Sequence, residues 1–286
     1  MWLTLIACFG SSKAPDPIEP PVAEAPAPAE APTEAPTEAP TTAPAPDPIL
    51  VEKLGQDLAE QVAQQRAAFD NIQTLDQFVA AFEGANALAD ALTKPLQAQY
   101  EAAQDANDMV GEVDVSWLLP HTPALVEGYF AEGTAIVLML EPEPWAAAAK
   151  KTPSSKDDDF LSFMALSYDN PGGVGWATWT ERNWDYGGCS TFGSGSHVKI
   201  LQAADKNLSA GTPFEGRIQK IRGELFDDIF NEASTFLYCD ANTNKPTPKD
   251  ALKKEGQQIL DTINLSDEER AKLQARLDAG FPLADQ

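Results

Sequence analysis

The sequence predicts a mainly α-helical fold, in which a helical hairpin is followed by an α-rich domain with a small β element and a Gly/Trp-rich loop. Three observations lead to this prediction. Apolar residues recur at three- and four-residue steps through residues 49–108 and 212–286, which is the spacing of a buried helix face. Capping residues precede these stretches, several of them followed by proline. Short β-branched runs are confined to the middle region, residues 109–211.

The folded part is predicted to begin with an antiparallel helical hairpin at residues 49–108. Asp47-Pro48 supplies an N-cap and a proline for the first helical position. Thr74-Leu75-Asp76-Gln77 opens the second helix as a capping box. Pro95 is expected to kink that helix, which continues to about Asn107. The predicted inward positions of the two helices are Leu50, Leu54, Leu58, Val62, Phe69, Leu75, Phe78, Phe82, Ala85, Ala89, Leu92 and Leu96.

The middle region mixes signals. Val113–Leu119 and Thr134–Leu140 are short, apolar and β-branched, so we expect strands there. Trp145–Lys151 is predicted as a short helix. Phe160–Tyr168 fits either a strand or a helix, and the acidic run before it favours a helix start. Asn170–Gly195 is rich in glycine and aromatic residues and is predicted to be an ordered loop region.

Helices are predicted again in residues 212–286. Thr212-Pro213-Phe214-Glu215 combines an N-cap, a proline and the reciprocal glutamate. Thr247-Pro248 starts another helix, and Ser266-Asp267-Glu268-Glu269 caps the last one, which Gly280 ends. The predicted buried positions are Phe214, Ile218, Ile221, Leu225, Ile229, Ala233, Leu252, Ile259, Leu260 and Ile263.

Composition and charge exclude several functional classes. The 286 residues include 20 Lys+Arg and 44 Asp+Glu, which leaves a formal net charge of −24. Proteins that follow nucleic-acid phosphates, or that dock on anionic lipid through their surface, need clustered basic residues. No apolar run approaches the roughly 20 residues of a spanning helix, so a polytopic membrane protein is excluded. We therefore expect no nucleic-acid partner.

The N-terminus carries a candidate lipidation signal. Leu5-Ile6-Ala7-Cys8 resembles the lipobox of exported bacterial lipoproteins. The resemblance implies that residues 1–7 are a signal-peptide remnant and that Cys8 carries acyl chains such as palmitate. It also implies a location at the bacterial cell envelope, on the outer membrane or the periplasmic face, with the lipid bilayer as a partner. Only seven residues precede Cys8 and none is basic, so we expect the true start to lie further upstream. The alternative is a chance apolar N-terminus in a cytosolic protein.

Residues 8–48 are predicted to be a lipid anchor followed by a disordered tether. The stretch from Ser11 to Pro48 consists largely of Pro, Ala, Glu and Thr, and it repeats Ala-Pro-Thr-Glu at residues 31–34 and 35–38. It lacks the apolar residues needed to fold and favours an extended polyproline II conformation. Its roughly 40 residues would reach on the order of 100 Å at about 3.1 Å per residue.

The two remaining cysteines form a candidate disulfide. Cys189 and Cys239 would meet oxidising conditions in an exported protein, where such a pair persists as a disulfide. In a cytosolic protein both would be free, buried thiols. Cys189-Ser190-Thr191-Phe192 also resembles the nucleophile segment of NlpC/P60 cell-wall peptidases. That resemblance implies a histidine well downstream, whereas the histidine that follows here is His197, eight residues on.

An aromatic segment is the candidate ligand-binding region. Trp176, Trp179, Trp184 and Tyr186 lie close together in the sequence, and such rings can serve as platforms for sugars. The alternative is that they fill a small core beneath the glycines. Asp240–Asn244 matches the first ligand positions of a calcium loop, but Lys245 stands at its sixth position and Ala251 at its twelfth. We expect no metal and no cofactor.

The predicted function is that of a cell-envelope lipoprotein with a non-catalytic binding or structural role. The alternative is a glycan- or peptidoglycan-binding, or glycan-cleaving, envelope protein that uses residues 176–192. The first rests on the lipobox and the tether, and on the lack of a complete catalytic set in the sequence. We therefore predict no catalytic residues. Beyond the bilayer, the predicted partner is a glycan or an envelope protein.

Overall fold

A computed structural model describes residues 44–105, 117–122, 127–131, 135–169, 176–182, 188–230, 238–240 and 245–281. The chain divides into two units, Met1–Thr41 and Thr42–Gln286, and the described residues all belong to the second. Cys8 and nearly all of the tether therefore lie outside the described residues. None of the described helices combines the length and the apolar character that crossing a membrane requires.

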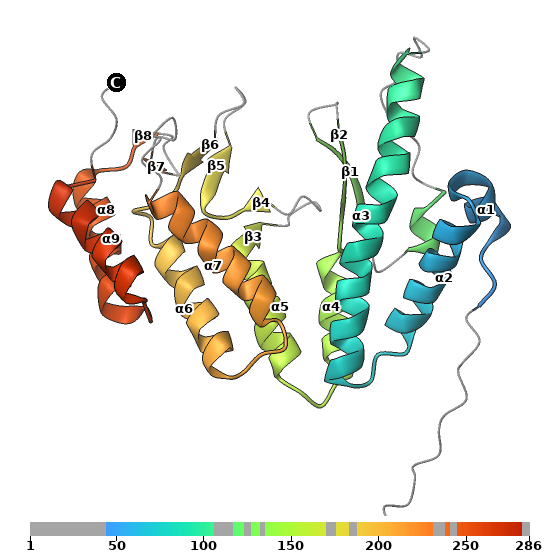
Figure 1. Cartoon of the computed structure of the whole chain (residues 1–286), viewed down its shortest axis with the longest axis horizontal. Coiled ribbons are helices and arrows are strands. Elements are labelled where there is room, and N and C mark those ends of the chain that lie inside the picture. The colour runs from blue at the N-terminus through green and yellow to red at the C-terminus, as the bar shows by residue number, and fades with distance from the viewer. Residues whose placement is uncertain are drawn as a thin grey trace, which may run out of the picture. The chain divides into compact units, whose positions relative to one another are not determined.

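The first three helices form the predicted hairpin (Figure 1). They are α1 (Pro48–Leu54), α2 (Gln56–Asp70) and α3 (Leu75–Asp105), and α2 packs along α3. The Asp47 side chain accepts a hydrogen bond from the Ile49 amide at 2.8 Å, which confirms the predicted N-cap. The first helix is broken at Gly55, which has φ +83°, a feature that the apolar spacing did not predict. The predicted hairpin is confirmed, but its first helix is divided into α1 and α2.

The start of α3 is the predicted capping box. The Gln77 amide donates to Thr74 Oγ1 at 3.3 Å, and Gln77 Oε1 accepts from the Thr74 amide at 3.1 Å. Pro95 lies inside the helix, which continues to Asp105, close to the predicted end. The kink expected at Pro95 stays a prediction.

A two-stranded antiparallel ribbon packs against α3. Strand β1 (Glu127–Ala131) pairs with β2 (Ala135–Met139), which confirms the strand expected at residues 134–140. The Ile136 amide donates to the Gln97 side chain at 2.9 Å, and this bond joins β2 to α3. The strand expected at 113–119 is wrong at its C-terminal end, where a turn leads into the 3₁₀ helix Leu119–His121. Its first four residues lie outside the described chain.

The next two helices carry much of the aromatic core. They are α4 (Pro142–Ala149) and α5 (Lys156–Ser167), so the segment that fitted either a strand or a helix is helical. Trp145 is 1 % exposed and lies edge-on to Phe82, with ring centroids 5.1 Å apart. Phe160 of α5 stacks on Phe214 at 3.8 Å between centroids. These contacts join the hairpin to the C-terminal helices.

The ordered loop predicted for residues 170–195 contains short strands in its described parts, and one further strand lies just before it. They are β3 (Tyr168–Asp169) with β4 (Trp176–Ala177), and β5 (Thr180–Arg182) with β6 (Gly188–Ser190). A third pair, β7 (Cys239–Asp240) with β8 (Lys245–Pro246), contains Asp240, the first residue of the calcium-loop match. All of these strands are antiparallel to their partners and only two or three residues long.

The C-terminal half is a set of packed helices (Figure 1). They are α6 (Ser196–Ser209), α7 (Glu215–Phe230), α8 (Lys249–Thr262) and α9 (Asp267–Ala279). Helix α6 was not predicted. Helix α7 begins at Glu215, two residues after the predicted start, because Thr212 Oγ1 bonds the Phe214 amide at 3.3 Å within a turn. The Ser266 capping box and the left-handed Gly280 at the end of α9 are confirmed.

Two groups of buried side chains hold the described residues together. The larger spans α3 to α9 and contains Trp145, Phe160, Phe192 and Phe214. The smaller lies between α1, α2, α3 and β2. Of the buried positions predicted for residues 212–286, Ala233 lies outside the described residues. The others are all buried: Phe214, Ile218, Ile221, Leu225, Ile229, Leu252, Ile259, Leu260 and Ile263. The mainly helical fold class is confirmed.

Candidate functional site

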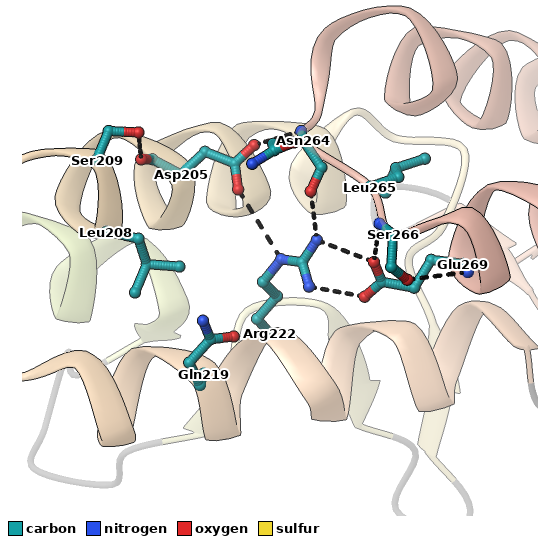
Figure 2. A pocket seen from close by; sticks show the side chains of 9 residues that line it. All are labelled: Asp205, Leu208, Ser209, Gln219, Arg222, Asn264, Leu265, Ser266 and Glu269. Carbon is teal, nitrogen blue, oxygen red and sulfur yellow. Dashed lines mark hydrogen bonds and ion pairs between the residues drawn. The ribbon is translucent and has the colours of Figure 1, made fainter.

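The candidate site is a pocket between α6, α7 and the turn that joins α8 to α9 (Figure 2). Its volume is about 450 Å³. Packing of the apolar stripe of α7 places Arg222 at the edge of that stripe, next to the buried Ile221. We call this the α6–α7 pocket, and it is lined by Asp205, Leu208, Ser209, Gln219, Arg222, Asn264, Leu265, Ser266 and Glu269.

Arg222 is the central side chain of the pocket, and its donors are largely occupied. Its Nη1 donates to Glu269 Oε1 at 2.6 Å, and its Nη2 donates to Glu269 Oε2 at 3.2 Å and to the Asn264 carbonyl at 2.8 Å. The guanidinium also lies 4.8 Å from the centroid of the Phe226 ring. Only 13 % of the side chain is exposed. A fork-shaped pair of this kind orients both partners.

Glu269 has two roles. It is the N3 residue of α9 and completes the capping box of that helix, where its Oε2 accepts from the Ser266 amide at 2.7 Å. It also receives the Arg222 fork. Burial raises the pKa of Glu269, but the hydrogen bonds from Arg222 and Ser266 outweigh it and leave that pKa below its ordinary value. The Glu269 carboxylate is therefore charged at neutral pH.

Asp205 lies across the guanidinium from Glu269 (Figure 2). Its Oδ2 accepts from the Asn264 amide at 2.7 Å, and its Oδ1 is 3.9 Å from Arg222 Nε. The second distance is an ion pair but too long for a hydrogen bond. Asp205 therefore has acceptor capacity that its described neighbours do not use.

Apolar side chains, amides and serine hydroxyls form the rest of the pocket wall. Figure 2 shows Leu208 and Gln219 on the side of Arg222 away from Glu269. Gln219 is exposed, and its side-chain amide makes no hydrogen bond to another described residue. The lining residues include no cysteine, histidine or lysine. Their carboxylates, amides and hydroxyls suit recognition of a ligand by charge and hydrogen bonds.

The predicted cysteine pair is brought together. Cys189 in β6 and Cys239 in β7 are in disulfide geometry, with Cα atoms 5.7 Å apart. Both are buried, and the neighbouring Ser190 and Tyr238 form a parallel bridge. The sulfur of Cys189 is paired with that of Cys239. Cys189, the candidate nucleophile of the peptidase resemblance, is therefore not a free thiol in this structure.

The predicted aromatic set is described only in part. Trp179 is 5 % exposed and packs in the larger core, with its ring 5.7 Å from that of Tyr168. A buried ring is not accessible as a sugar platform, so Trp179 fits the alternative of a core residue. The side chain of Trp176, and all of Trp184 and Tyr186, lie outside the described residues.

A second polar cluster surrounds His197, the histidine considered as a base. His197 is fully buried, and its Nε2 lies 2.8 Å from Asp228 Oδ2. The same oxygen accepts from Ser190 Oγ at 2.5 Å. The carboxylate thus stands between hydroxyl and imidazole, unlike a catalytic triad, in which the imidazole contacts the hydroxyl. The arrangement joins β6, α6 and α7.

The calcium-loop match falls in a hairpin. Asp240 pairs with Lys245 across β7 and β8, and residues 241–244 lie outside the described residues. Within the described part of the chain, no three His, Cys, Asp or Glu side chains are grouped to hold a metal ion. Sequence reasoning missed the α6–α7 pocket altogether, since its residues come from three separate stretches, 205–209, 219–222 and 264–269.

Comparisons with known proteins found no matching family model, no matching curated protein and no matching solved structure.

Proposed function

We propose that this chain is a lipid-anchored protein of the bacterial cell envelope, whose helical domain has a non-catalytic binding or structural role. Cys8 would carry the acyl chains, on the outer membrane or the periplasmic face. The tether that follows it would hold the domain away from the bilayer.

The observation that carries this proposal is the pairing of Cys189 and Cys239. Stable disulfides belong to oxidising compartments such as the periplasm, and free thiols are the rule in the cytosol. The pair closes a loop with a sequence separation of 50 residues. Closing such a loop is worth about 4 kcal/mol in the chain-entropy account of disulfides. It supports an exported protein, as the lipobox resemblance of residues 5–8 does independently.

The α6–α7 pocket supports a binding role. It is a concave site with a fixed guanidinium–carboxylate pair and an unused acceptor on Asp205. Such a combination of shape and oriented polar groups is typical of ligand sites.

Two experiments test the proposal. Radiolabelled palmitate fed to the native bacterium should label the wild-type chain and leave the Cys8→Ser variant unlabelled. Absence of label on the wild type, or equal label on both, contradicts the anchor. Thiol titration of the denatured Cys8→Ser chain should find no free thiol before reduction and two after it. Two free thiols before reduction contradict the proposed compartment.

A further inference from the structure

We propose that the α6–α7 pocket binds a small aliphatic amine, with the ammonium group on the Asp205 carboxylate and the alkyl chain over Leu208. The inference rests on the binding role proposed above and names the chemical class of the ligand. Three features of the pocket support this ligand class: an acceptor on Asp205 without a hydrogen bond, the net charge of the lining residues and an apolar wall.

The free acceptor is Asp205 Oδ1. The partner oxygen, Oδ2, is engaged by the Asn264 amide at 2.7 Å, which fixes the carboxylate in place. Oδ1 is 3.9 Å from Arg222 Nε, beyond hydrogen-bond distance. A carboxylate accepts at both oxygens, and only 20 % of this side chain is exposed. A donor that enters the pocket therefore meets an oriented, unsaturated anion.

The charge balance favours a cation over an anion. Two carboxylates, Asp205 and Glu269, face one guanidinium, so the charged lining groups sum to −1. Arg222 directs its hydrogen bonds to Glu269 and Asn264, and an anionic ligand would have to displace them. An ammonium group brings three donors and the compensating charge. The exposed Gln219 amide oxygen offers a further acceptor at the rim.

The apolar wall determines the rest of the ligand. Leu208 and Leu265 are half-buried and line the pocket beside the polar groups. Packing an alkyl chain on these leucines is favourable because it removes apolar surface from water. A second charged group at the same place would lose its hydration without gaining a partner. The volume of about 450 Å³ limits the ligand to a small molecule.

The test compares two probes of the same size. The full chain, labelled with ¹⁵N, is titrated with n-butylamine and with 1-butanol in about 150 mM NaCl, which screens long-range attraction. We expect saturable shifts of the Ser209, Asn264 and Leu265 amides with butylamine, at a dissociation constant on the order of millimolar for so small a ligand. Butanol should give no saturable shift. Equal binding of the two probes, or no saturation with butylamine, overturns the proposal.

Variants separate the site from general attraction to an acidic protein. Asp205→Asn removes the charge but keeps an oxygen for the Asn264 amide, and it should weaken butylamine binding at least tenfold. Asp250→Asn removes the same charge from an exposed position on α8 outside the pocket, and it should leave binding within twofold. Equal effects of the two variants overturn the proposal.

A third variant covers the case in which Asp205→Asn does not fold. Gln219→Lys places a competing ammonium at the rim from an exposed position on α7, so it should fold and still weaken binding at least fivefold. Unchanged binding in this variant overturns the proposal. If palmitate labels the chain but butylamine does not bind, the ligand class alone is contradicted. If palmitate does not label the wild-type chain, the anchor is contradicted.

Discussion

Glu255 of α8 accepts a hydrogen bond from the backbone amide of Gly193 at 2.5 Å, across 62 residues of sequence. The same carboxylate accepts from the Gly195 amide at 2.9 Å and from the Val198 amide at 3.1 Å. It is 2 % exposed. Glu255 thus satisfies the amide of Gly195, the N-cap of α6, and the amide of Val198 in the first turn of that helix. The N-cap glycine has no side chain to accept a hydrogen bond, and the Glu255 carboxylate lies at the positive end of the helix.

Replacing Glu255 by Gln should destabilise the fold. The amide NH₂ would face a backbone N–H, so at least one buried donor would lose its acceptor, at a cost of about 2 kcal/mol. Urea denaturation of both proteins measures the difference in the free energy of unfolding. Glu52→Gln, at an exposed position on α1, is the matched control and should change it by less than about 0.5 kcal/mol. Equal stability of Glu255→Gln and wild type would contradict the capping role.

The two glycines of this loop should respond differently to alanine. Gly193 has φ +99°, and an added Cβ would collide with Thr247 Cγ2, so Gly193→Ala should cost about 3 kcal/mol. Gly195 has φ +88° but open space around the added Cβ, so only the backbone cost of about 1 kcal/mol is expected. Thermal unfolding followed by circular dichroism ranks the two. A Gly195→Ala variant as unstable as Gly193→Ala would show that the loop is placed differently.

Trp179 distinguishes a core residue from a sugar platform. Its ring is buried, so Trp179→Ala should lower the free energy of unfolding by about 3 kcal/mol through the lost contacts and the cavity left behind. Chemical denaturation, followed by the fluorescence of the other tryptophans, measures this change in the free energy of unfolding. A variant of wild-type stability that no longer binds peptidoglycan would instead place the ring on the surface and restore the glycan-binding hypothesis for this residue.

The contribution of Glu269 should depend on pH. Its pKa in the folded chain is below the ordinary value of 4.5, so its carboxylate stabilises the fold above that value. The contribution is lost as the pH falls through the lowered pKa. The difference in unfolding free energy between wild type and Glu269→Gln should therefore be largest at neutral pH, about 1 kcal/mol for a partly exposed pair, and shrink as the pH falls below 4.5 and through the lowered pKa. A difference independent of pH would contradict the charged pairing with Arg222.

Local signals in the sequence were sufficient for most helices. The Thr74 and Ser266 caps, and the apolar spacing of α7 and α8, lie within a few residues of the structure that they determine. Their hydrogen bonds and buried faces are therefore readable without knowing the fold. Gly55 shows the limit of this approach, because it breaks the first helix while the apolar spacing continues across it.

Helix α6 and the pocket depend on residues far apart in the sequence. Two of the amides at the start of α6, those of Gly195 and Val198, are satisfied by Glu255 of α8, and the N-cap residue Gly195 has no side chain that could mark this start in the sequence. The pocket likewise joins Asp205 to Glu269 through Arg222, and only the packing of α6, α7 and α9 brings them together. The spacing of Val198, Leu201 and Ala204 was the available signal for α6, since all three are buried on one face.

The most direct measurement is mass spectrometry of the N-terminal peptide of the protein isolated from its native membrane. The proposed function requires a mature chain that begins at Cys8, with a diacylglyceryl group on the sulfur and an acyl chain on the amine. A native N-terminal peptide that retains residues 1–7 joined to an unmodified Cys8 would contradict the account.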